Sequence, residues 1–235
     1  MLILAFLTRY LVFEVTSVAA LLMGSALVFT NMESYVKARV ANLSMRGPLM
    51  ALHQSLINSG FAGRAFYIPD RNQGDPVKML IATSNADPQA AVLNEQSVQG
   101  TLLDAPGEGV VEILREELGG LSGKNFIYLE EWLPRAVVEG LGLAEKMWLK
   151  LEGDEVKMEI QRPVFQTLCQ DPELNETVCV RFGCPFAGGI AAALAESTGR
   201  GVEFVTCGHD RKLETSTGLF MLRAQVSQRN FEHES

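Results

Sequence analysis

Hydrophobic residues are concentrated at the start of the chain. Only Arg9 and Glu14 interrupt the apolar stretch Met1–Thr30, and Leu11–Thr30 is long enough to cross a bilayer core as one helix. A secretory signal would have a basic start and a shorter apolar run. We therefore expect residues 1–30 to form a transmembrane anchor, with a cleaved signal and a buried core helix as the alternatives.

Residues 31–60 combine polar residues with apolar ones at helical spacing. Glu33–Asn58 is expected to be helical, with a break near Gly47 and Pro48, because proline suits the first turn of a second helix. This stretch should be a helical stalk or linker that packs either on its own domain or on other subunits of a homo-oligomer. Basic residues outnumber acidic ones in residues 31–50, which predicts a single-pass protein with a cytoplasmic C-terminal domain.

Residues 61–235 alternate between strand and helix patterns and should form one soluble domain. The strands are expected at Arg64–Pro69, Val77–Thr83, Leu102–Leu103, Lys146–Leu151, Val156–Gln161, Val178–Phe182, Val202–Cys207 and Gly218–Val226. The helices are expected at Val110–Leu118, Phe126–Leu141 with a kink at Pro134, and Pro185–Ser197, and a loop at Ala86–Gly100. Strands that arrive in pairs between helices predict an α+β fold with a mixed or antiparallel sheet.

The segment Pro185–Ser197 has the clearest packing pattern. Phe186, Ile190 and Leu194 share one face of the expected helix, which should pack tightly on the sheet. The small residues Gly188 and Gly189 would let a neighbouring backbone approach closely.

Charge and composition limit the classes of partner that the chain could bind. The 235-residue chain has a net charge of −8, and Arg9 and Glu14 cancel, so the whole excess lies in residues 31–235. An acidic body argues against nucleic acid as a partner, since binding to phosphates needs a basic face. Asp104–Gly109 lacks the Lys-Ser or Lys-Thr of a phosphate-binding loop, and no cofactor is indicated.

The four cysteines lie in the last third of the chain, at Cys169, Cys179, Cys184 and Cys207. Cys184 precedes Pro185 and should stand at a helix N-terminus, which stabilises a thiolate. A catalytic thiol would also need a base, such as His209. A metal site would use Cys179, Cys184, Cys207 and His209. The alternatives are small buried cysteines and, in an oxidising compartment, a disulfide between Cys169 and Cys179.

Several short motifs occur in a recognisable order: Phe66–Pro69, Leu103–Gly109, Phe182–Pro185, Ala191–Ala195 and Gly199–Val202. Together they resemble a family of archaeal membrane-anchored proteins that has no assigned activity. The resemblance implies an N-terminal membrane segment followed by an α/β domain. Members usually carry two adjacent spans, and MLILAFL is too short for a first one, so this chain either has one span or starts upstream of Met1.

A second resemblance is to hydrocarbon-binding domains of the vinyl-reductase type. Leu141–Leu143, the small-residue helix and the cysteine-ended strand Val202–Cys207 follow one another in the order found in those domains. The resemblance implies binding of small apolar ligands and a role as sensor or trafficking adaptor.

Two hypotheses follow. The first is a membrane-anchored, non-enzymatic domain that binds a protein partner or a small ligand. The second is a thiol- or metal-dependent enzyme or redox sensor built on Cys184, Cys207 and His209. The second requires these three side chains to meet around one pocket.

Overall fold

The computed structural model describes residues 42–69, 76–83 and 100–225. The predicted span Leu11–Thr30, residues 31–41 of the predicted stalk and residues 86–99 of the predicted loop lie outside the described residues. The chain divides into two compact units, Met1–Leu43 and Ser44–Ser235, and the second contains all the features considered below.

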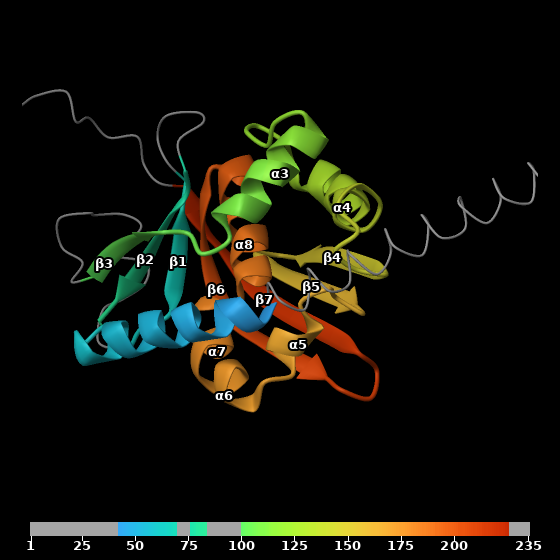
Figure 1. Ribbon diagram of the computed structural model, residues 1–235. Helices are drawn as coiled ribbons and strands as arrows, with labels where there is room; N and C mark the ends of the chain where they lie inside the picture. The colour runs from blue at the N-terminus through green and yellow to red at the C-terminus, as the bar shows by residue number, and fades with distance from the viewer. Residues whose placement is uncertain (1–41, 70–75, 84–99, 226–235) are drawn as a thin grey trace, which may run out of the picture. The chain divides into compact units, whose positions relative to one another are not determined.

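One seven-stranded sheet organises this second unit, in the order β3-β2-β1-β6-β7-β5-β4 (Figure 1). Its strands are β1 Ala65–Ile68, β2 Lys78–Ala82, β3 Gly100–Asp104, β4 Lys146–Glu152, β5 Glu155–Gln161, β6 Arg200–Asp210 and β7 Thr215–Gln225. All neighbouring strands run antiparallel. The predicted α+β class is therefore confirmed, and of the two expected kinds of sheet, mixed or antiparallel, the domain has the antiparallel one.

The hairpin of β4 and β5 follows from its alternating sequence. Met147 and Leu149 are buried while Trp148 between them is exposed, so one face of the hairpin joins the core. Gly153, with φ of 68°, makes the turn, in a backbone region that favours glycine. The period of two in the sequence thus sets both the register and the buried face.

The helices α3 (Glu108–Leu118), α4 (Phe126–Arg135) and α8 (Pro185–Thr198) pack on one face of the sheet, with α8 between α3 and the strands (Figure 1). The predicted helix Phe126–Leu141 changes form after Pro134. It continues as a π-helical turn, η1 Ala136–Gly140, which ends with a hydrogen bond from the Leu141 amide to the Ala136 carbonyl. Proline lacks an amide donor, and the wider turn begins two residues after it.

Helix α8 is buried on every side, beyond the single apolar face that its sequence predicts. A Cβ atom at Gly188 would lie 2.7 Å from the Tyr67 hydroxyl, and one at Gly189 would lie 2.7 Å from Val110 Cβ. The glycines therefore let β1 and α3 approach the helix closely, as predicted. Glycine costs helix stability, and here this cost is offset by dense packing.

Among the described residues, one helical stretch, Pro172–Thr198, is long and apolar enough to cross a membrane by length and composition. In the structure 89% of its most apolar window is buried inside the domain. This stretch serves as the core of the domain.

The predicted strand Val178–Phe182 is wrong. Residues 166–182 instead form short helical turns: α5 Gln166–Cys169, α6 Pro172–Leu174, η2 Asn175–Cys179 and α7 Val180–Phe182. Asp171 accepts hydrogen bonds from the amides of Glu173 and Leu174, and Pro172 follows at the first helical position. Because the helix start at Asp171 and Pro172 is strong, helical turns continue through Val178 and Val180, although valine by itself favours a strand.

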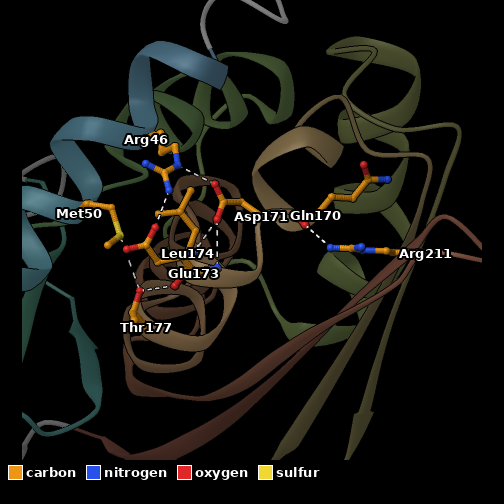
Figure 2. A network of polar contacts seen from close by, with 8 residues as sticks. All are labelled: Arg46, Met50, Gln170, Asp171, Glu173, Leu174, Thr177 and Arg211. Atoms are coloured by element: carbon orange, nitrogen blue, oxygen red, sulfur yellow. Dashed lines mark hydrogen bonds and ion pairs between the residues drawn. The ribbon is translucent and has the colours of Figure 1, made fainter.

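Residues 44–58 form one helix that passes through Gly47 and Pro48 without the predicted break. Leu56 is buried in the core, so the helix packs on its own domain, and this packing offsets the hydrogen bond that Pro48 cannot make. Arg46 attaches the helix to α6, since its Nε atom lies 2.6 Å from Asp171 Oδ2 and its Nη2 atom 2.6 Å from Glu173 Oε2 (Figure 2).

Candidate functional site

All four cysteines line one pocket between the α5–α8 segment and strands β5, β6 and β7. Cys169 ends α5, Cys179 ends η2, Cys184 precedes α8, and Cys207 lies on β6. The pocket has a cavity of about 20 Å³, which is room for little more than one water molecule. Met158, Ile160, Phe165 and Phe186 supply much of its wall.

Cys184 is the N-cap residue of α8, and its Sγ atom accepts a hydrogen bond from the Ala187 amide at 3.4 Å. Pro185 at the first helical position fixes this geometry. A hydrogen bond from the Cys169 thiol lowers the pKa of Cys184 to about 7, with help from the amides of Phe186 and Ala187 and against the effect of burial. Cys184 is therefore the thiol best suited to react as a thiolate.

Cys169 connects Cys184 to two further polar side chains. Its hydrogen bond to Cys184 and its burial raise the pKa of the Cys169 thiol above the usual range, while a hydrogen bond with Ser216 acts in the opposite direction. The Ser216 hydroxyl also lies 2.9 Å from His209 Nδ1. Cys184, Cys169, Ser216 and His209 therefore form a continuous chain of hydrogen bonds across the pocket.

The surroundings of the His209 ring favour its neutral form. Burial lowers its pKa, and the neighbouring Arg211 adds to this effect. A neutral imidazole keeps one nitrogen as an acceptor, so His209 can take a proton through Ser216.

Cys179 and Cys207 form the second thiol pair. A hydrogen bond with Cys207, together with burial, raises the pKa of Cys179 above the usual range. Cys207 Sγ also lies 3.9 Å from the side-chain oxygen of Asn175, to which it donates. Cys179 is thus held as a thiol, which sets it apart from Cys184.

The structure brings together every site residue that the sequence singles out. Cys179, Cys184, Cys207 and His209 all line the same pocket, and all four cysteines are free thiols. Cys169 lies next to Cys184 rather than forming a disulfide with Cys179. Within the described part of the chain, no three histidine, cysteine or acidic side chains are arranged to hold a metal ion, so the four-residue metal site stays a prediction.

Two important residues are absent from the sequence-based site. Cys169 and Ser216 are 47 positions apart in the chain and meet only in the folded domain, where Cys169 at the end of α5 forms a hydrogen bond with Ser216 on β7. No spacing rule connects them, and the sequence pattern predicts none of the short helical turns in residues 166–182 that position Cys169. The single signal in the sequence is the gathering of all cysteines in its last third.

Comparisons with known proteins add one distant structural match. No family model and no curated protein matches the chain. A solved structure, trafficking protein particle complex subunit 3 from Naegleria fowleri covalently bound to palmitic acid, matches 52% of this chain and 76% of that chain. The identity is 16% and the TM-score 0.37. At this level of similarity the match assigns neither a fold family nor a function to the chain.

Proposed function

We propose that this domain is a thiol-based redox sensor. The observation that supports the proposal is the single pocket that gathers four free thiols as two hydrogen-bonded pairs, Cys169 with Cys184 and Cys179 with Cys207. A thiol of low pKa beside a second thiol is the arrangement that forms and opens a disulfide readily. In a reducing cytoplasm such a bond would be transient, as sensing requires.

The position of the thiols offers a route for a signal. Cys169, Cys179 and Cys184 lie on or next to the α5–α7 segment, and Arg46 attaches helix 44–58 to Asp171 and Glu173 of the same segment (Figure 2). Thr177 on η2 also contacts Met50 of that helix through its hydroxyl. A disulfide that shifts these short turns would therefore alter the docking of the helix that leads toward the proposed anchor.

Equilibration of the full-length protein with glutathione buffers tests the sensor function. We expect the number of free thiols to fall by two as the buffer becomes oxidising, and to return fully after reduction. The count is read from intact mass after alkylation under denaturing conditions. Four thiols that persist in the most oxidising buffer, with the domain still folded, would rule out the redox function.

Binding of a small apolar ligand is the second candidate, because apolar side chains supply much of the pocket wall. The cavity of about 20 Å³ would have to open for any ligand larger than a few atoms. Native mass spectrometry of the full chain should then show a retained ligand mass, and the same spectra report a protein partner or homo-oligomer. If gentle conditions give only the mass of the monomer, this result would contradict both ligand binding and association with a protein partner or a second copy.

We further propose that Leu11–Thr30 tethers the domain to a membrane as a single span, with the domain in the cytoplasm. The length of this apolar stretch and the basic residues that follow it support the proposal. Full-length protein should remain in the membrane pellet after a carbonate wash. Release into the supernatant would contradict the tether and leave the redox function untouched.

A further inference from the structure

Cys184 and Cys169 differ in exposure and in hydrogen bonding, and they should therefore differ in reactivity. Cys184 is 8% exposed and receives the Ala187 amide hydrogen bond, whereas Cys169 is partly exposed and donates toward Cys184. The cavity beside them admits one molecule about the size of water, and its wall is largely apolar. Such a site slows the reaction of bulky or charged oxidants, such as glutathione disulfide, relative to small neutral ones, of which hydrogen peroxide is the simplest.

We propose that Cys184 is a peroxide-reactive cysteine, that Cys169 is its resolving partner, and that Ser216 and His209 carry away the proton of Cys169. This inference rests on the proposed redox function and names its oxidant and its reacting atoms. The assignment depends on geometry: the N-cap position of Cys184, the adjacent Cys169 and the 2.9 Å contact between Ser216 and His209.

The chemistry balances in two steps. The Cys184 thiolate attacks one oxygen of hydrogen peroxide, an S–O bond forms, the O–O bond breaks, and hydroxide leaves. Cys184 is then a sulfenic acid, and the peroxide has accepted two electrons. Next the Cys169 sulfur attacks Cys184 sulfur, so that an S–S bond forms and the S–O bond breaks. Cys169 loses a proton, which Ser216 and His209 hold until the departing hydroxide takes it, and water is the product.

Ser216 and His209 act on the second step. Once Cys184 is a sulfenic acid, the Cys169 thiol turns its proton to Ser216 Oγ, and Ser216 gives its own proton to His209 Nδ1, the acceptor in the ring tautomer that carries its proton on Nε2. Burial holds the pKa of His209 below its ordinary value, which keeps this acceptor free. Both are therefore positioning residues for proton transfer, and neither contacts the peroxide oxygen that is transferred.

The test is treatment of full-length protein with one equivalent of hydrogen peroxide in the presence of dimedone, a reagent that traps sulfenic acids. The wild type should lose two thiols and trap little dimedone. Cys169→Ser should accumulate the adduct at Cys184, because the resolving thiol is gone. Cys184→Ser should form neither adduct nor rapid disulfide. An adduct at Cys169 in that variant, or wild-type rates without Cys184, would overturn the assignment.

Ser216→Ala separates a proton relay from a structural role. It should slow disulfide closure by about tenfold and raise the yield of trapped sulfenic acid, because the intermediate lives longer. Thr215→Val is the matched control, since it removes a hydroxyl one position earlier on β7 that bonds to the Leu213 carbonyl. It should trap no more dimedone than the wild type. Equal trapping in the Ser216 and Thr215 variants would refute the relay.

The outcomes also separate this inference from the sensor function. If glutathione buffers close the Cys169–Cys184 disulfide but peroxide does not react faster than with an ordinary thiol, the peroxide assignment fails and the sensor stands. If neither oxidant closes any disulfide in the folded protein, both fail.

Discussion

Replacing Gly107 with alanine should destabilise the domain by about 3 kcal/mol or more, which is the largest effect expected for so small a change. Gly107 precedes α3, and a Cβ atom there would collide with the Gly189 amide, the Gly189 Cα atom and the Pro185 carbonyl of α8. These are backbone atoms, so rotation of a side chain cannot relieve the clash. Its φ of −104° suits alanine, and the whole effect therefore comes from helix packing.

Gly109→Ala is the matched control for this substitution. Gly109 lies two residues further along, inside α3, and its Cβ atom would meet nothing within 4 Å. Alanine should stabilise the helix there by about 0.5 kcal/mol. Urea denaturation of both full-length variants, followed by circular dichroism, gives the two free energies of unfolding. Similar values for the two variants would mean that α3 and α8 do not approach as described.

Alkylation of Cys184 should follow a thiolate with a pKa of about 7. The groups that face it are Cys169 and Cys179, Tyr67 on β1, and His209 across the pocket. Burial raises the pKa of Tyr67, and Cys179 is held as a thiol, so neither adds negative charge near neutral pH. The alkylation rate should therefore rise with pH and reach half its maximum near pH 7, as the depressed pKa requires.

Cys169→Ala tests the cause of that low pKa. Without the Cys169 donor, the midpoint of the Cys184 alkylation profile should move toward the ordinary value of about 8.5, and the rate at pH 7 should fall about tenfold. The rate is read from the tryptic peptide of residues 182–200, in which Cys184 is the only cysteine. An unchanged midpoint would show that the helix N-terminus alone sets the pKa.

Local signals in the sequence predict most of the sheet and the long helices. The hairpin of β4 and β5 has a strict period of two, and α8 has a proline at its start and Gly199, in the left-handed conformation, at its end. The strand prediction at Val178–Phe182 fails because β-branched residues indicate a strand only when no cap competes. Here Asp171, seven residues before Val178, caps a helix that begins at Pro172. The valines by themselves give no indication of this helix start.

Local signals in the sequence identify only part of the site. Cys184 is recognisable because Cys-Pro at a helix start is a local signal, and His209 because it is close to Cys207 in sequence. Cys169 and Ser216 join the site only through the tertiary structure, which brings both side chains to the same pocket and which no local pattern encodes. Tertiary structure also determines which thiols are neighbours. Proximity in the sequence favours a pair of Cys169 and Cys179, whereas the structure places Cys169 next to Cys184.

The position of the disulfide that forms on oxidation of the full-length protein shows whether Cys169 and Cys184 are the reactive pair. Trypsin yields peptides 158–181, with Cys169 and Cys179, 182–200, with Cys184, and 201–211, with Cys207, because the bond before Pro163 resists cleavage. We expect peptides 158–181 and 182–200 to be joined, and a further cut after Glu173 to leave Cys169 on the joined part. A bond between Cys169 and Cys179 would contradict this pairing. So would a domain that still has four free thiols after treatment with the oxidant.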